Sequence, residues 1–130
     1  MLKFIARLFE GSIDIERTYG HCDQAIGLLQ SYNENPDGFS EKKKTDMDET
    51  VEVAIREATN LISLEGEKNW IGVFREMHSN LAAIHLELGN RDKVDYHCEK
   101  LADYGEPGRL DAEEILGKLN QAQSDTPSTR

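Results

Sequence analysis

Residues 69–90 read NWIGVFREMHSNLAAIHLELGN, and this stretch decides the fold class. Its large apolar side chains recur at alternating spacings of four and three residues: Trp70, Phe74, Met77, Leu81, Ile84 and Leu88. That period is typical of one buried face of an α-helix. Gly89 and Asn90 follow, and a glycine directly after the last apolar position is a common helix C-cap. The stretch therefore predicts a helix over residues 69–88.

A second helix is predicted directly after it, over residues 91–104. Val94, Cys98 and Leu101 fall on one side of this segment and point inward. The sequence Gly-Glu-Pro-Gly at 105–108 is expected to stop the helix. The turn at Gly89-Asn90 joins the two helices and is short, and a short turn places two helices side by side and antiparallel. The centre of the chain is thus predicted to be a helical hairpin.

In the frame of residues 75–108 this hairpin resembles a tetratricopeptide repeat, a helical hairpin of about 34 residues. The matching positions are Leu81, Ala82, Leu88, Gly89, Val94 and Leu101. The sequence departs from the repeat at His78 and His85, where aromatic residues are usual, and at Pro107, which falls one residue late. The resemblance implies a scaffold that binds proteins or peptides and has no chemistry of its own. An ordinary antiparallel helix pair is the alternative.

The rest of the chain divides into further helices. A short amphipathic helix is predicted over 2–10, with Leu2, Ile5, Leu8 and Phe9 on one side, a break at Gly11 and a new helix over 13–33. The turn signal Asn-Pro-Asp-Gly and the run Lys42–Lys44 predict a mobile loop over 34–45. Thr45 is expected to cap a helix that ends at Gly66, and a last helix is expected over about 110–122.

These segments predict an all-α fold of five or six helices, in a single bundle or a short TPR-like helical array. We expect one domain over residues 1–122 and a disordered tail over 123–130, which is polar throughout. The short N-terminal amphipathic helix has two interpretations. It could cap the core, or, with Lys3 and Arg7, contact a membrane surface or a partner.

The chain is acidic, with a formal net charge of −10. Residues 1–45 hold six Lys or Arg against seven Asp or Glu, and residues 46–130 hold nine against eighteen. The acidity therefore belongs to the C-terminal two-thirds. A field of this sign repels phosphate backbones, which argues against nucleic acid as a ligand. It favours a partner protein with a basic surface.

The cysteines and the hydropathy pattern indicate the compartment. Cys22 and Cys98 lie far apart and form no Cys-x-x-Cys motif, which favours a reduced, cytoplasmic setting. No stretch approaches the roughly 18 apolar residues of a membrane-spanning helix, so we expect no membrane insertion.

Histidine and cysteine together raise the possibility of a metal site. The candidates are the pairs His21-Cys22 and His97-Cys98, and His78 with His85 on one helix face. Adjacent helical residues point about 100° apart, so neither pair readily supplies two ligands to one ion. Both cysteines fall on apolar stripes, where Cys acts as a small hydrophobic residue. No His-Glu-x-x-His, phosphate-binding loop or Gly-x-Ser-x-Gly occurs, and we expect no metal, cofactor or catalytic residue.

One acidic surface stands out on the helix predicted over 91–104. Asp92, Asp95, Glu99 and Asp103 fall within a narrow arc, and Tyr96 lies beside them. Like charges in a row repel one another, and a basic partner would relieve that repulsion. Tyr96 could anchor such a contact. The plain alternative is a solvated surface, since acidic helix faces are common.

These features predict a non-catalytic, acidic protein-binding module. Its most concrete form is an immunity or antitoxin-type inhibitor that binds a basic toxin such as a nuclease. The predicted contact residues are Asp92, Asp95, Tyr96, Glu99 and Asp103. One alternative is a TPR-like adaptor or chaperone that holds a peptide. A second is an enzyme or metal protein that uses the His and Cys residues.

Overall fold

The computed structural model describes the backbone of residues 2–124 and the side chains of residues 15–121. This part of the chain contains five α-helices, one short 3₁₀ helix (η1) and no strand, which confirms the all-α prediction. The elements are α1 (Leu2–Glu34), η1 (Pro36–Gly38), α2 (Glu41–Ile62), α3 (Ile71–Leu88), α4 (Arg91–Ala102) and α5 (Gly105–Ser124).

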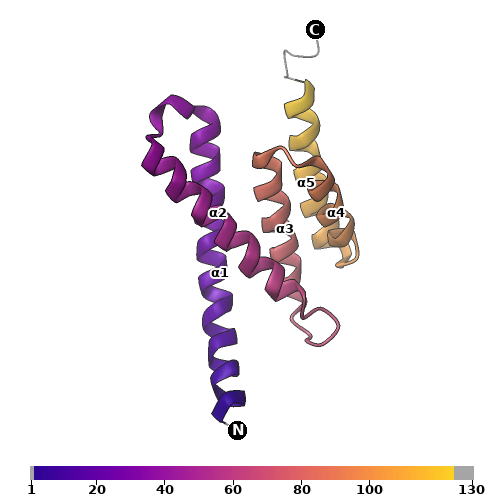
Figure 1. Ribbon diagram of the computed structural model, residues 1–130. Coiled ribbons are helices and arrows are strands. Elements are labelled where there is room, and N and C mark those ends of the chain that lie inside the picture. The colour runs from indigo at the N-terminus through magenta and orange to yellow at the C-terminus, as the bar shows by residue number, and fades with distance from the viewer. Residues whose placement is uncertain (1, 125–130) are drawn as a thin grey trace.

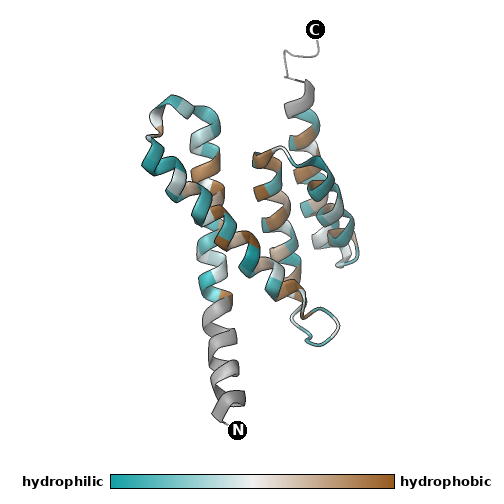
Figure 2. Ribbon diagram, in the orientation of Figure 1, coloured by the Kyte–Doolittle hydropathy of each residue, from teal (hydrophilic) through white to brown (hydrophobic). Residues whose placement is uncertain are grey.

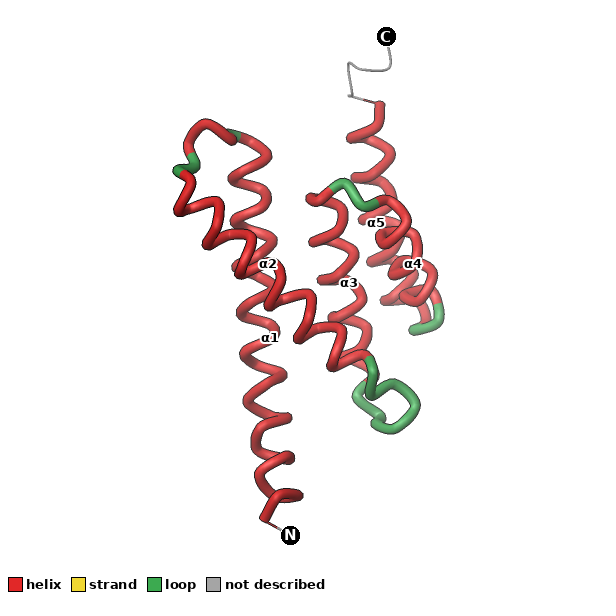
Figure 3. Tube along the Cα trace, viewed as in Figure 1, coloured by secondary structure: helices red, strands yellow, loops and turns green. Residues whose placement is uncertain are grey.

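The helices alternate in direction along the chain. Helices α1, α3 and α5 run one way, and α2 and α4 run the other way (Figure 1). The pairs in contact are α1–α2, α1–α3, α2–α3, α3–α4, α3–α5 and α4–α5. Helix α3 therefore touches all four others, whereas α2 and α4 make no contact with each other among the described residues. The connection over 63–70 bulges from the end of the bundle between α2 and α3 (Figure 3).

The core has two parts, one on each side of α3. Brown, apolar stretches occur on α1, α2 and α3 (Figure 2). This first cluster consists of Cys22, Ala25, Leu29, Met47, Val51, Ala54, Ala58, Leu61, Met77, Leu81 and Ile84. The second lies between α3, α4 and α5 and consists of Ala82, Val94, Cys98, Leu101, Ala112, Ile115 and Leu119. Small residues in both let the helix backbones approach closely.

Helix α3 ends where the sequence predicts, but it begins at Ile71 rather than at residue 69, and Leu88, which is predicted to lie on the buried face, is 40% exposed. Gly89 takes a left-handed φ of 80°, a conformation that glycine adopts without steric strain, and ends α3 as expected. The amide of Asn90 then bonds to the carbonyl oxygen of His85 at 2.9 Å. The chain reverses here, and α4 begins at Arg91.

The predicted break at Gly11 is wrong, because α1 runs without interruption from Leu2 to Glu34. A glycine inside a helix costs only about 1 kcal/mol relative to alanine, and a long packed helix absorbs that cost. Gly20 is likewise helical. The interpretations of residues 2–10 concern side chains that lie outside the described ones.

The start of α2 also differs from the prediction. Ser40, not Thr45, is the N-cap, and its Oγ accepts a bond from the Lys43 amide at 3.1 Å. Residues 41–45 of the predicted loop therefore belong to α2. Between the helices, Phe39 packs edge-on against Tyr32 with ring centroids 5.2 Å apart, which fixes the turn to the end of α1.

The Gly-Glu-Pro-Gly segment starts a helix rather than only ending one. Gly105 has a φ of 78° and closes α4, and α5 begins at the same residue. Pro107 is tolerated because the amides of a first helical turn have no intrahelical partner. Helix α5 extends to Ser124, two residues into the predicted tail. Residues 125–130 lie outside the described part.

Candidate functional site

The five residues predicted to bind a partner share one surface, formed by α4 and its C-cap Asp103. Asp92, Asp95, Tyr96, Glu99 and Asp103 are all exposed. Tyr96 keeps 48% of its surface in solvent. The opposite side of α4 is buried and consists of Val94, His97, Cys98 and Leu101. The helix thus separates an acidic outer face, defined by the five residues above, from the second core cluster.

The acidic outer face is only slightly neutralised by the chain's own cations. Arg91 Nε lies 3.9 Å from Asp95 Oδ2, and both side chains are more than half exposed. An ion pair this exposed contributes at most about 1 kcal/mol. Lys100 Nζ lies 5.8 Å from the Tyr96 ring centroid. Within the described residues, no Lys or Arg forms an ion pair with the other three carboxylates.

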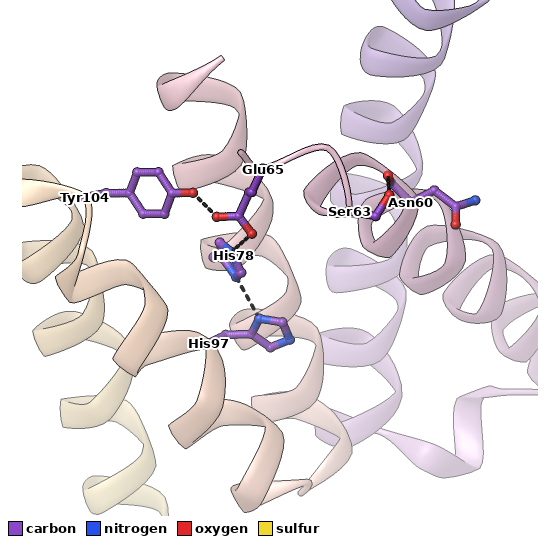
Figure 4. A network of polar contacts seen from close by, with 6 residues as sticks. All are labelled: Asn60, Ser63, Glu65, His78, His97 and Tyr104. Carbon is purple, nitrogen blue, oxygen red and sulfur yellow. Dashed lines mark hydrogen bonds and ion pairs between the residues drawn. The ribbon is translucent and has the colours of Figure 1, made fainter. Parts of the chain in front are cut away.

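A polar network, which the sequence did not predict and which is buried only at its histidines, joins α3, α4 and the α2–α3 connection. His78 Nδ1 lies 3.0 Å from His97 Nδ1, and His78 Nε2 lies 3.0 Å from Glu65 Oε1. The hydroxyl of Tyr104 donates to the other oxygen of Glu65 (Figure 4). We call these four residues the His–Glu network. It ties a loop residue to both helices of the central hairpin.

The positions of the protons in the His–Glu network follow from which atoms can donate and which can only accept a hydrogen bond. An ionised carboxylate only accepts, so His78 Nε2 carries the proton in its bond to Glu65. Burial, with the charges of His78, His85 and Lys93, lowers the pKa of His97 to about 3, so His97 is neutral near pH 7. A third imidazole, His85, stacks on His97 with ring centroids 6.1 Å apart, and burial lowers its pKa as well.

The imidazoles of this network are held by protein groups. Both ring nitrogens of His78 are bonded to protein groups, and no part of His78 is exposed. In the described part of the chain, no three His, Cys, Asp or Glu side chains are placed to hold a metal ion. The helical pattern could have shown that His78 and His97 point inward. It could not have found Glu65, whose loop has no period.

The two cysteines lie in different core clusters and are unpaired. Burial, with Asp23 and Glu57 nearby, raises the pKa of Cys22 to about 12. Burial and Asp95 raise the pKa of Cys98 to about 11. Since the thiolate is the nucleophilic form, neither thiol is reactive near neutral pH.

A second surface feature spans α1, α3 and α5. A hollow of about 380 Å³ is lined by Tyr19, Asp23, Arg75, Glu76, Ser79, Asn80 and Asp111. A second hollow of about 400 Å³ is lined by Ile26, Gln30, Asn33, Ala83, Leu86, Glu87, Ile115 and Lys118. On each helix the second set lies C-terminal to the first. Because the three helices run in the same direction, the two hollows lie end to end, and we call them together the groove.

The first half of the groove is polar and partly buried. Arg75 Nη1 on α3 lies 2.8 Å from Asp111 Oδ2 on α5, and about 30% of each side chain is exposed. Burial, then a hydrogen bond to Glu76 and its negative charge, raises the pKa of Tyr19. No described Lys or Arg forms an ion pair with Asp23 or Glu76. This half therefore carries an excess of negative charge.

The second half of the groove is more apolar. Ile26, Leu86 and Ile115 come from three different helices and are at least partly buried. Asn33 Nδ2 bonds to the carbonyl oxygen of Glu87 at 2.9 Å, which ties the end of α1 to α3. The one cation in this half, Lys118, lies 3.6 Å from Glu114 on its own helix.

Comparison of the chain with protein-family models, with curated proteins and with solved structures finds no match. Among the described residues, no helix has both the length and the apolar character needed to cross a bilayer. The groove and the acidic outer face therefore have to be interpreted from their own geometry.

Proposed function

We propose that this chain is a non-catalytic protein-binding module that holds an extended segment of another protein in the groove. The observation that carries the proposal is the end-to-end placement of two hollows along three parallel helices. Each hollow lies within the usual size range for binding sites, roughly 300–1,000 Å³. Two recesses in line suit an extended chain segment better than a compact small molecule.

The order of helix contacts supports a TPR-like array. Each odd-numbered helix contacts the next odd one, and each even-numbered helix packs only against its two neighbours in sequence. Two helical hairpins and one extra helix, stacked in this way, leave α1, α3 and α5 lining a common face. The same arrangement follows from the tetratricopeptide resemblance of residues 75–108. The unpaired, buried cysteines support a reducing, cytoplasmic setting.

The acidic outer face of α4 is a second candidate site. Three of its carboxylates have no ion pair among the described residues, and Tyr96 is nearly half exposed between them. Such a surface fits the basic partner of an immunity or antitoxin-type inhibitor. It lies on the side of α4 that is turned away from the core, so the two candidate sites can be mutated independently.

Affinity capture from cell extract with three versions of the chain distinguishes the sites. Ala83→Trp fills the second hollow, and Asp95→Lys with Glu99→Lys reverses charge on α4. Proteins retained by the wild type and by the α4 variant, but lost with Ala83→Trp, support the groove. The reverse pattern, with retention that weakens at high salt, supports the acidic outer face. If both variants retain every protein that the wild type retains, both sites are contradicted.

A folding control is needed because tryptophan is bulky. Ala83 is only partly buried, and the groove beside it is open to solvent. We therefore expect Ala83→Trp to retain the helical circular dichroism and cooperative thermal unfolding of the wild type. Ser79→Trp blocks the first hollow and provides an independent second variant.

A further inference from the structure

The groove has an electrostatic polarity along its length. Its first half contains three carboxylates and one guanidinium, from Asp23, Glu76, Asp111 and Arg75. The ion pair at 2.8 Å joins Arg75 to Asp111 and cancels one charge of each sign. Asp23 and Glu76 remain, one on α1 and one on α3, on either side of the hollow. Two carboxylates around one recess attract a single cationic side chain.

The second half of the groove has no excess of negative charge. Its charged groups are one acid and one base, Glu87 and Lys118. Its apolar side chains are Ile26, Ala83, Leu86 and Ile115. A recess of this composition gains free energy by covering an apolar side chain of the occupant, at roughly 25 cal/mol for each Å² removed from water.

The distance between the halves sets the spacing of the two side chains. The residues that would make the two contacts are three residues apart on α1 (Asp23 to Ile26) and ten residues apart on α3 (Glu76 to Leu86). At a rise of 1.5 Å per residue these intervals are about 4.5 Å and about 15 Å, with a mean of roughly 10 Å. An extended peptide in the polyproline II conformation advances about 3.1 Å per residue and returns a side chain to the same face every third residue, so three positions cover roughly this distance.

We infer that the occupant of the groove is an extended peptide segment that places a Lys or Arg side chain between Asp23 and Glu76 and an apolar side chain, three positions away, on Ile26, Leu86 and Ile115. This assignment rests on the proposed function and adds the chemistry of the partner. The charge that selects the cation is distinct from the acidic outer face of α4.

A linear 12-residue peptide library displayed on phage tests the assignment. The library is selected on the immobilised wild-type chain and depleted on Ala83→Trp and Ser79→Trp. We expect the groove-dependent peptides to share a Lys or Arg and, three positions away, a Leu, Ile, Met or Phe. Groove-dependent peptides with acidic or uncharged residues at the first position would overturn the assignment but leave the proposed function intact. No groove-dependent peptide at all would overturn both.

An enriched peptide, labelled with fluorescein, then allows a double-mutant cycle by fluorescence anisotropy. We expect Asp23→Asn with Glu76→Gln to weaken binding roughly threefold to tenfold, because each exposed charge pair contributes modestly. A peptide with Gln in place of its cation should bind both forms of the chain equally. Asp48→Asn with Glu52→Gln, two exposed acids on α2, is the matched control and should change nothing. If the groove variant and the α2 control lose the same peptide affinity, the effect comes from net charge alone and the assignment is rejected.

Discussion

The two sides of α3 are packed by different means. Towards α1 and α2, α3 presents Met77, Leu81 and Ile84 to an apolar cluster. Towards α4 it presents His78 and His85, which meet His97 in a buried layer of imidazoles. Apolar contacts tolerate many sequences of similar volume, whereas each hydrogen bond between buried groups needs one partner in one position. The first side provides cohesion, and the second fixes the position of the α2–α3 connection.

The largest effect is expected where α4 and α5 meet. A Cβ at Gly108 would lie 2.0 Å from the carbonyl oxygen of Leu101, so Gly108→Ala forces the two helices apart. We expect a loss of roughly 3 kcal/mol in the free energy of unfolding, measured by urea denaturation. Gly117→Ala, in the same helix, meets no atom within 4 Å and should instead stabilise the chain by about 0.5–1 kcal/mol. Similar values for both variants would contradict the close approach of α4 and α5.

Adjacent residues of α3 compare the two sides directly. Met77 and His78 are both fully buried, one in the apolar cluster and one in the His–Glu network. Met77→Leu conserves volume and should cost less than about 1.5 kcal/mol. His78→Leu removes a partner from both Glu65 and His97, and we expect a further loss of about 1–3 kcal/mol. Urea denaturation of both variants measures the difference, and equal losses would show that the network adds nothing beyond packing.

Lowering the pH should reduce the free energy of unfolding through the buried imidazole of His97. The unfolded chain protonates His97 near pH 6.5, whereas the folded chain protonates it only at about pH 3. Between these values the unfolded state binds more protons, so stability falls as the pH is lowered and is unaffected above this window. The expected slope is at most about 1.4 kcal/mol per pH unit for this residue. Denaturation of the wild type from pH 7 to pH 5 should therefore give a steeper pH dependence than that of His97→Leu. Met77→Leu, which removes no titrating group, should keep the wild-type slope.

The smallest effect concerns an unpaired polar atom in α1. Thr18 is fully buried, and its hydroxyl has no hydrogen-bond partner, unlike the ring nitrogens of His78. Thr18→Val replaces that hydroxyl by a methyl group of similar size. We expect a gain of about 1 kcal/mol in the free energy of unfolding, measured by thermal denaturation. Thr50 bonds to the Asp46 carbonyl at 2.9 Å and is the matched control, for which Thr50→Val should give no gain. A loss of stability in Thr18→Val would mean that the hydroxyl is paired in solution.

The sequence by itself determined the features that depend on local periodicity. The apolar spacing of residues 70–88 predicted α3, Gly89 predicted its end, and the carboxylates of α4 were correctly placed on one exposed face. These follow from the 3.6-residue period of the helix and from the unique conformational range of glycine, which act over a few residues.

Only the tertiary structure decided the features that depend on distant parts of the chain. Helix α1 continues through Gly11, and α5 begins at Gly105 rather than at residue 110. Glu65 meets His78 and Tyr104 because three separate segments converge, and the groove exists because α1, α3 and α5 lie beside one another. Such contacts are selected by packing and by the pairing of buried polar groups, which have no signature in a short sequence window.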